Sequence, residues 1–295
     1  CKGEERIPEV LKLGCQVSIA GNISYAFARA EKLGCTAMQI FARNPRQHRK
    51  GQLSEELIAV FRKRAAETKI RPVVIHIPYT LNLASHNTRF YQITIREFTE
   101  DLREADTLGA QYLVTHMGSH KGGSESSGLG RVVAALDRIL NSTEGTRTEI
   151  LLENTAGSGK WLGYSFAQLR YVLDRLGWPS RVGICIDTAH AWAAGYKIDD
   201  SAGVKRFCAQ FEESIGAQRL KVVHLNDTRE ELNSRRDRHC DIGKGKIGRR
   251  GFSALLRHPM FRGAAFILET PKQDERDDER NLRTVRKLFQ DGLHA

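Results

Sequence analysis

The sequence predicts a single α/β domain with the (β/α)8 architecture of a TIM barrel. Eight short apolar runs rich in β-branched residues alternate with longer helical patterns along the 295 residues. Most runs are continuously apolar, as expected of parallel strands that are buried on both faces. The spacing of about 37 residues suits one strand and one helix in each of eight units. A doubly wound open sheet is the rival, but the first run is followed by the segment SIAGN and not by a glycine-rich phosphate-binding turn.

The strands are predicted where β-branched and other apolar residues form short runs between polar or glycine-containing segments. They cover residues 14–19, 37–41, 73–76, 112–116, 150–154, 183–187, 221–225 and 264–269.

The helices between these strands are predicted from apolar periodicity and from capping residues. Asn22 and Ser54 are suitable N-caps, and Gly34, Gly109 and Gly177 are suitable residues just after a helix. The predicted helices cover residues 23–33, 54–68, 88–108, 129–140, 165–176, 204–215, 252–256 and 279–289.

The domain organisation is simple, because no proline- or serine-rich linker interrupts the alternation of strands and helices. Residues 1–13 are expected to be an N-terminal extension, and residues 14–295 to form one barrel domain.

The composition excludes several classes of protein. With 40% hydrophobic and 27% charged residues, the chain is not typical of disordered proteins. No apolar run is long enough to span a membrane, and the first 20 residues lack the apolar core of a signal peptide. The six cysteines form no C-x-x-C pair, which indicates free thiols in a reducing compartment. The net charge of +11 favours an anionic partner, with nucleic acid as the first candidate.

Six of the predicted strands end in imidazole or carboxylate side chains. In a parallel barrel the carboxyl ends of all strands open on one face, so these side chains would point into one cup. A single such residue is usually a hydrogen-bonded polar group, but burying six titratable groups together is costly unless something pairs with them. Three imidazoles and three carboxylates are donors that divalent ions accept, Zn²⁺ in particular. The six residues are His76, His116, Glu153, Asp187, His224 and Glu269.

Two further pairs of candidate ligands extend this cup. The run D-T-A-H places His190 just beyond Asp187, and the run D-R-H places Asp237 and His239 after the seventh strand. These residues would form a third site, so that nine ligands suit three metal ions with one bridging carboxylate. Two ions about 3.5–4 Å apart can activate water and hold the leaving oxygen in a phosphoryl displacement. No G-x-S-x-G or Walker motif offers a different route.

With these residues in place, the sequence resembles the endonuclease IV family of zinc-dependent apurinic/apyrimidinic endonucleases. The similarity extends roughly from Gly14 to Phe289. The segments ENTAG, CIDTAHA and HLND followed by SRRDRH are the most specific. The matching motifs are QIFARNPRQ, HIPYTLNLA, HMGSH, LLENTAG, GICIDTAHAWAAGY, HLNDTREELNSRRDRH and ILETP.

The resemblance implies three zinc ions in a barrel that cuts DNA 5′ to abasic sites, leaving a 3′-hydroxyl and a 5′-deoxyribose phosphate. It also implies the removal of blocking groups from 3′ ends, with Glu153 as the catalytic bridging ligand. Mn²⁺ or Fe²⁺ could replace one zinc ion. The implied ligands are His76, His116 and Glu153 for the first ion, Glu153, Asp187, His224 and Glu269 for the second, and His190, Asp237 and His239 for the third.

The resemblance further implies that the protein bends DNA and inserts side chains at the lesion. Arg46 and Tyr79 occupy the matching positions. Much of the excess positive charge falls in loops expected on the metal-bearing face, which favours a surface that follows DNA phosphates. Arg62, Lys63 and Arg64 are expected to be ordinary solvent-exposed charges. The loop cations are Arg43, Arg46, Arg49, Lys160, Arg229, Arg235, Arg236, Arg238, Lys244 and Lys246.

Two positions depart from the commonest family pattern. Gln16 stands at the end of the first strand, where many relatives carry histidine, and Cys240 follows His239 in place of a polar residue or a second histidine. Neither change affects the nine implied ligands, and a thiol at position 240 could be oxidised or could bind metal.

Two alternatives to the nuclease interpretation remain. One is a divalent-metal sugar isomerase or epimerase on the similar xylose-isomerase-like barrel, and the other is a metal-stabilised DNA-binding module. The expected partner is double-stranded DNA with abasic sites or blocked 3′ ends, without any membrane. The protein is expected to be an intracellular monomer, cytoplasmic and associated with the nucleoid in a prokaryote.

Overall fold

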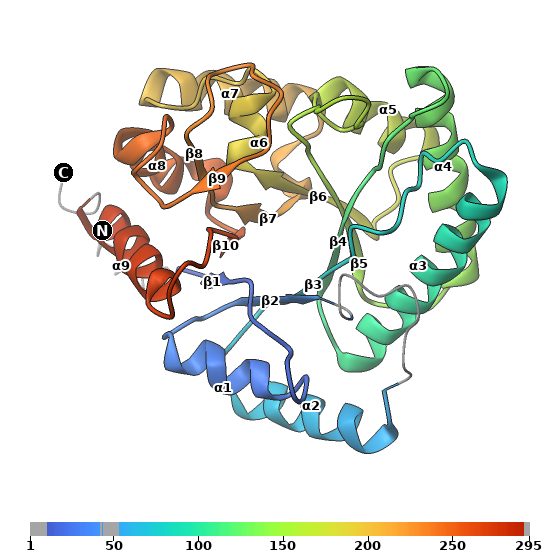
Figure 1. The fold of residues 1–295 in the computed structure, drawn as a ribbon, viewed down its shortest axis with the longest axis horizontal. Coiled ribbons are helices and arrows are strands. Elements are labelled where there is room, and N and C mark those ends of the chain that lie inside the picture. The colour runs from blue at the N-terminus through green and yellow to red at the C-terminus, as the bar shows by residue number, and fades with distance from the viewer. Residues whose placement is uncertain (1–10, 42, 44–52, 292–295) are drawn as a thin grey trace, which may run out of the picture.

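The computed structural model describes residues 11–41, 43 and 53–291, and here eight parallel strands are surrounded by helices (Figure 1). Seven strands begin and end within one residue of the predicted bounds, whereas the first ends four residues earlier, at Cys15. The strands are β1 (Leu13–Cys15), β2 (Met38–Phe41), β3 (Val73–His76), β4 (Tyr112–His116), β5 (Glu149–Glu153), β6 (Val182–Asp187), β7 (Leu220–His224) and β10 (Ala265–Leu268).

The sheet closes on itself, which confirms the predicted barrel. Hydrogen-bonded neighbours follow the order β1-β10-β7-β6-β5-β4-β3-β2. A short seam joins β1 to β2, where Gln16 forms a parallel bridge with Gln39 and the Val17 amide donates to the Gln39 carbonyl at 2.7 Å. Gly14 is needed here, because a Cβ atom at this position would overlap the carbonyl of Ala37.

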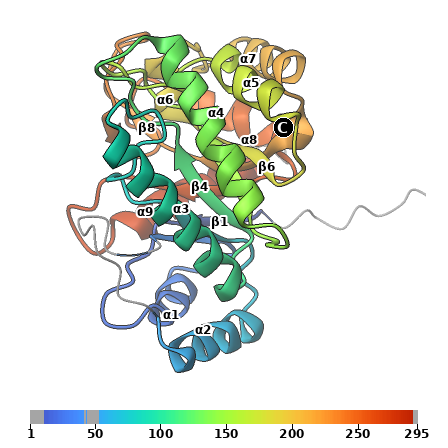
Figure 2. The same ribbon diagram turned by 90° about the vertical axis from the view of Figure 1, so that its right-hand side faces the viewer.

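The helices form an outer ring around the strands, and α3 packs beside α4 over β4 (Figure 2). The predicted helix over 88–108 matches α3, and the predicted helix over 252–256 is longer in the structure. Ser24, and not Asn22, is the residue preceding α1. The helices are α1 (Tyr25–Lys32), α2 (Glu55–Glu67), α3 (Thr88–Leu108), α4 (Glu125–Ser142), α5 (Phe166–Leu176), α6 (Thr188–Ala193), α7 (Ser201–Ser214), α8 (Gly248–Arg257) and α9 (Asp277–Asp291), with short 3₁₀ turns at Ala217–Arg219 and Pro259–Phe261.

Three short elements, one helix and two strands, have no counterpart in the sequence prediction. Helix α6 starts directly after β6, and the two-residue strands β8 (Asp227–Thr228) and β9 (His239–Cys240) form an antiparallel pair after β7. All three elements lie on the face of the barrel where the strands end. They therefore add backbone around the predicted cup.

The hydrophobic core has two parts. A large cluster fills the space between strands and helices, and a smaller one fills the inside of the barrel. None of the helices in the described ranges is long and apolar enough to cross a membrane. The inner cluster contains Ala37, Val74, Val114, Leu151, Cys185, Val222, Ala265 and Ile267.

Candidate metal centre

The inner cluster explains why the six predicted strand-end residues meet. Side chains alternate in direction along a strand, so a residue two positions beyond an interior residue also faces the interior. His76 follows Val74 in this way, and His116 follows Val114. The same step of two links the inner-cluster residues of β5, β6, β7 and β10 to Glu153, Asp187, His224 and Glu269. The six side chains therefore form one polar layer above the apolar interior.

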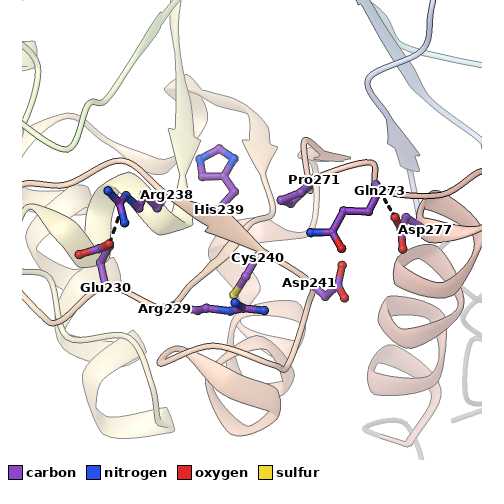
Figure 3. A pocket seen from close by; sticks show the side chains of 9 residues that line it. All are labelled: Arg229, Glu230, Arg238, His239, Cys240, Asp241, Pro271, Gln273 and Asp277. Carbon is purple, nitrogen blue, oxygen red and sulfur yellow. Dashed lines mark hydrogen bonds and ion pairs between the residues drawn. The ribbon is translucent and has the colours of Figure 1, made fainter.

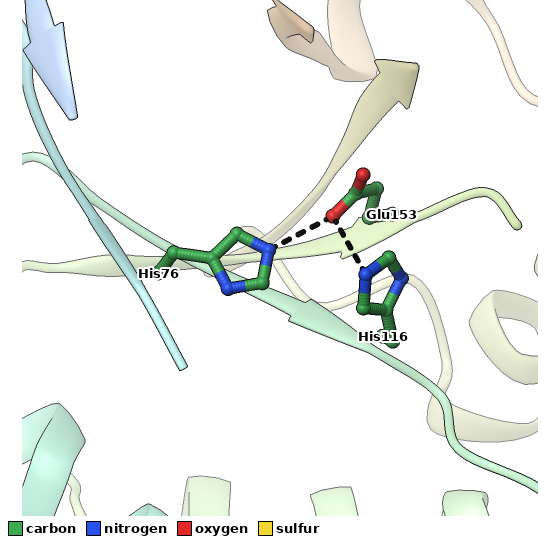
Figure 4. A group of neighbouring side chains, drawn as sticks. All are labelled: His76, His116 and Glu153. Atoms are coloured by element: carbon green, nitrogen blue, oxygen red, sulfur yellow. Dashed lines mark hydrogen bonds and ion pairs between the residues drawn. The ribbon is translucent and has the colours of Figure 1, made fainter. Parts of the chain in front are cut away.

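The first group consists of His76, His116 and Glu153, and Figure 4 shows both rings directed at one carboxylate. Oε2 of Glu153 lies 3.0 Å from Nε2 of His76 and 3.5 Å from Nε2 of His116. Nδ1 of His76 is 2.7 Å from the carbonyl of Ile77, which leaves Nε2 facing the group. These three donors come from the adjacent strands β3, β4 and β5.

The second group shares Glu153 with the first. Its members are Glu153, Asp187, His224 and Glu269, whose donor atoms lie within 4.8 Å of one another. Nδ1 of His224 is 2.9 Å from Oε1 of Glu153 and 3.2 Å from Oε2 of Glu269. The two oxygens of Glu153 therefore face different groups, Oε2 the first and Oε1 the second.

The third group depends on helix α6 and strand β9, which the sequence did not predict. Asp187 caps α6 by accepting the His190 amide at 2.8 Å, and this places the imidazole one turn beyond β6. His239 comes from β9, and its Nε2 lies 3.6 Å from Oδ2 of Asp187. Asp237 bridges the two rings, at 3.1 Å from His190 and 3.2 Å from His239. The donor atoms of Asp187, His190 and His239 lie within 4.8 Å of one another, and Asp237 joins this third group through its contacts with the two rings.

The electrostatics of the cup fit cation binding. Burial opposes ionisation of Glu153, yet the imidazoles of His116 and His224 hold its pKa well below the usual range. Burial lowers the pKa of His116 to about 4, so that this ring is neutral at neutral pH. Burial also disfavours charge on His239, but the carboxylates of Asp187 and Asp237 raise its pKa to about 9. In the absence of metal, protons on such imidazoles compensate the negative charge of the carboxylates. Bound metal ions would supply the same positive charge.

The donor set fits zinc. Each group offers imidazole nitrogens and carboxylate oxygens, the donors that Zn²⁺ accepts. Among the described residues, the buried Nε2 of His239 has no hydrogen bond of good geometry, although two carboxylates lie nearby. An unsatisfied buried nitrogen facing carboxylates is expected where a cation is to be bound.

Two asparagines that the sequence did not single out hold the backbone and the side chain of Asp187 in place. Asn154 accepts the Asp187 amide at 2.6 Å, and its own carbonyl lies 3.0 Å from Nδ1 of His190. Asn226 donates to Oδ2 of Asp187 at 2.7 Å and accepts the Glu269 amide at 2.9 Å. Both side chains are buried. Their position in the sequence could have indicated this role, since each asparagine lies within two residues of a predicted ligand.

A pocket of about 260 Å³ opens between the first and third groups. Tyr79 and Trp161 line it together with His116, His190 and Asp237. The Trp161 ring meets His116 edge to face, with 5.9 Å between ring centres. Tyr79 is 60% exposed while its ring contacts Phe41 and His76, so it stands at the mouth of the cup.

The predicted DNA-contacting arginines have different surroundings. Arg46 lies outside the described residues. Arg236 and Arg238 are largely exposed, at 3.8 and 3.5 Å from Glu230. Arg235 lies over the ring of Tyr164, 4.2 Å from its centre, and its carbonyl accepts the Ser158 hydroxyl. This contact ties the loop after β7 to the loop after β5.

Arg43 was expected to face DNA phosphates, and the structure contradicts this. Its side chain is 6% exposed, and its guanidinium lies 2.6 Å from Glu97 and 3.4 Å from Asp101 of α3. An arginine that is buried between two carboxylates is a structural ion pair and not a free phosphate ligand. The loop position alone did not reveal these partners.

A second cavity, of about 270 Å³, lies behind His239 (Figure 3). Its wall includes Arg229, Arg238 and Cys240, and Glu230 contacts Arg238 at its edge. Cys240 is buried, and burial raises its pKa to about 11. The thiol is therefore not ionised at neutral pH, and Cys240 belongs to none of the three groups of donors.

Comparison with known proteins adds independent information. A family model described as a xylose isomerase-like TIM barrel matches residues 27–291. The chain is 42% identical over 276 residues to the probable endonuclease 4 of Methanoculleus marisnigri, covering 94% of this chain and 98% of that protein. The crystal structure of endonuclease IV from Thermus thermophilus matches with a TM-score of 0.84 and 33% identity, covering 95% of this chain and 99% of that one.

The fold is also shared more widely. A D-tagatose 3-epimerase-like protein matches with a TM-score of 0.72 over 96% of this chain and 97% of its own, at only 20% identity. Likeness at this level shows a common barrel and nothing about a common reaction.

Proposed function

The chain belongs to the endonuclease IV family, and from that premise we propose that it cuts the phosphodiester bond 5′ to abasic sites in duplex DNA. The products would be a 3′-hydroxyl and a 5′-deoxyribose phosphate. Removal of blocking groups from 3′ ends belongs to the same proposal, because it breaks the same type of bond at a strand terminus.

The observation that carries the proposal is the position of Glu153. Its carboxylate faces the first group through Oε2 and the second through Oε1, so one side chain would bridge two ions. Paired divalent ions activate water and stabilise the charge that develops on phosphate oxygens. The carboxylate of Glu153 is held rigidly, because the residue ends a strand and its side chain is 1% exposed.

We infer three Zn²⁺ ions per chain, held by the three groups. His76 and His116 would complete the first site, and the third would be completed by His190, Asp237 and His239. The remaining ligands of the second site would be Asp187, His224 and Glu269. Replacement of one zinc by Mn²⁺ or Fe²⁺ is part of this inference, since the donors are nitrogen and oxygen only.

Recognition of the lesion would use the pocket beside the cup. An abasic nucleotide has no base to unstack, so turning it out of the duplex costs little. Its sugar would enter between Tyr79 and Trp161, while Arg236 and Arg238 contact phosphates from the exposed loop. Arg46 and Arg235 are proposed as further DNA contacts.

The sugar isomerase or epimerase alternative accounts for the barrel and for one or two metal sites. It offers no reason for a third group that includes a half-exposed Asp237, nor for arginines next to that group. The isomerase or epimerase reaction is therefore the second candidate function.

The decisive experiment combines metal content with strand cleavage. Purified protein, reconstituted with zinc, is incubated with a duplex carrying one tetrahydrofuran abasic analogue and with the intact duplex of the same sequence. We expect about three zinc ions per chain and cleavage of the first duplex only. Fully metallated protein that leaves the abasic duplex uncut would refute the proposal, and turnover of a ketose in its place would favour the alternative.

A further inference from the structure

Two glutamines complete the polar layer of the barrel. Gln39 stands two residues after the interior residue Ala37, and Gln16 two residues after Gly14, just as the six acidic and histidine residues stand on the other strands. Gln39 is fully buried, and neither glutamine can provide an anionic or imidazole ligand. A buried carboxamide is costly unless all of its polar atoms are used, so its partners indicate its role.

The carboxamide of Gln39 contacts two members of the second group. Oε1 of Gln39 lies 2.8 Å from Nε2 of His224, so it accepts the hydrogen of that nitrogen. Nε2 of Gln39 donates to Oε1 of Glu269 at 2.6 Å. These contacts leave Nδ1 of His224 and Oε2 of Glu269, which are 3.2 Å apart, facing the interior of the group.

Gln16 determines which way the Gln39 carboxamide points. Its Oε1 accepts the second hydrogen of the Gln39 amide at 2.9 Å. If the Gln39 carboxamide were reversed, its oxygen would face two other acceptors, and its NH2 group would face the N–H of His224. The orientation of the amide is therefore set from three sides.

We propose that Gln16 and Gln39 form a positioning pair that holds His224 with Nδ1 and Glu269 with Oε2 directed at the metal of the second group. The proposal rests on the proposed function, because it assumes that this group binds zinc. Partners that fix the ring nitrogen and orientation of a metal-binding histidine are a general feature of such sites. The position where Gln16 replaces the commoner histidine thus acquires a role in metal binding.

The test compares zinc affinity in four variants. Gln39→Met removes both contacts at similar volume, and Gln16→Met removes only the acceptor behind Gln39. Gln16→His restores an acceptor, because a neutral imidazole has one free nitrogen. Gln111→Met is the matched control, since Gln111 also uses its oxygen and its nitrogen, on the Val73 amide and the Gly109 carbonyl, at the opposite ends of the strands.

Each zinc-loaded variant is dialysed against a graded series of chelator concentrations, and the retained zinc is measured per chain. We expect Gln39→Met to hold one zinc ion about 10- to 100-fold more weakly than the wild type. Gln16→Met should show a smaller loss in the same direction, whereas Gln16→His and Gln111→Met should retain zinc like the wild type.

Thermal unfolding of the metal-free variants separates positioning from a merely structural role. If Gln39→Met and Gln16→Met lower the melting temperature but leave zinc retention unchanged, the positioning role is refuted. If Gln39→Met does not fold, Gln16→Met and Gln16→His decide between the outcomes, because Gln16 is only partly buried. Wild-type protein that retains zinc but cuts no abasic DNA would refute the proposed function alone, and the affinity comparison would still stand.

Discussion

Glu153 has partners on all sides, which makes it the most informative single residue to change. Replacing it by glutamine keeps the shape of the side chain and removes the negative charge that both groups share. We expect Glu153→Gln to lower the rate of abasic-site cleavage by about a thousandfold or more. DNA affinity should change little, since phosphate contacts come from the loops.

The measurements are single-turnover cleavage and a binding titration with the abasic duplex. Glu149→Gln, at the other end of the same strand, is the control and should cut at the wild-type rate. Cleavage by Glu153→Gln at the rate of the control would contradict the bridging role.

At the residue scale, the ligand-type side chains were predictable and their supports were not. A histidine or carboxylate at a strand end stands out in an apolar run, whereas Gln39 inside AMQIF is the kind of residue that such a run tolerates. Its role depends on partners 185 and 230 residues away along the chain, which no local pattern reveals. The prediction for Arg43 was wrong for the same reason, because its partners Glu97 and Asp101 come from a helix that is distant in the sequence.

Among the elements, the loop after β9 depends on one buried carboxylate. Asp227 is fully buried in β8, and its two oxygens accept the backbone amides of Thr228, Gly243, Gly245, Ile247 and Gly248. These contacts shape residues 241–248, which carry Lys244 and Lys246. Ile242 and Ile247 anchor this loop in the hydrophobic core, and its polar backbone between them is ordered by hydrogen bonds to a single side chain.

Asp227→Asn tests this dependence. One of the acceptor oxygens becomes an NH2 group, which leaves two or three backbone amides facing a donor. We expect the free energy of unfolding to fall by about 2–4 kcal/mol, measured by urea denaturation. Asp137→Asn on the exposed side of α4 should stay within about 0.5 kcal/mol of the wild type. Equal stability of the two variants would show that the loop does not need Asp227.

The exposed segment between β8 and β9 gives a second prediction at this scale. If Arg236 and Arg238 each neutralise a phosphate, replacing both by alanine lowers the slope of log affinity against log salt by about 2. The same double replacement at Arg62 and Lys63, exposed on α2, should leave the slope unchanged. A slope that falls equally in both double variants would mean that the charge acts over the whole surface.

Strand positions were predictable because buried parallel strands appear as continuous apolar runs, and helix ends were predictable because glycines and capping residues mark them. Ser54 caps α2 and Gly109 follows α3 in the left-handed conformation, as expected. Helix α6 has only six residues, and β8 and β9 have two each, too short for any periodicity to appear. These short elements nevertheless build the third group.

For the whole molecule, the metal-free protein should lose stability as pH rises above neutrality, and bound zinc should offset this loss. In metal-free protein, the carboxylates of Asp187 and Asp237 raise the pKa of His239 to about 9 against the opposing effect of burial. Because the pKa of His239 is higher in the folded protein than the ordinary histidine value of about 6.5, protonation of this ring stabilises the fold. The stabilisation is complete at pH values below about 6.5 and is lost as pH rises through 9. Zinc competes with these protons for the ring nitrogens.

Melting temperatures at pH values of about 6.5, 8 and 9.5 test this prediction. The chelator-treated protein should melt several degrees lower at the highest pH than at the lowest. The zinc-loaded protein should gain stability, relative to the metal-free form, over the same interval. A metal-free protein whose melting temperature rises with pH would contradict the assigned direction.

The seam between β1 and β2 has a consequence for local opening. In the described part of the chain, the amides of Thr36 and Ala37 donate across it to the Leu13 carbonyl, and that of Val17 donates to Gln39. The side chain of Gln39 also holds two members of the second group. Separation of the two strands would therefore disturb that group, and by thermodynamic linkage an occupied group resists the separation. Zinc should slow hydrogen exchange at Val17 more than at amides of β4 or β5. Bound metal would in this way stabilise the closure of the barrel between its first and second strands.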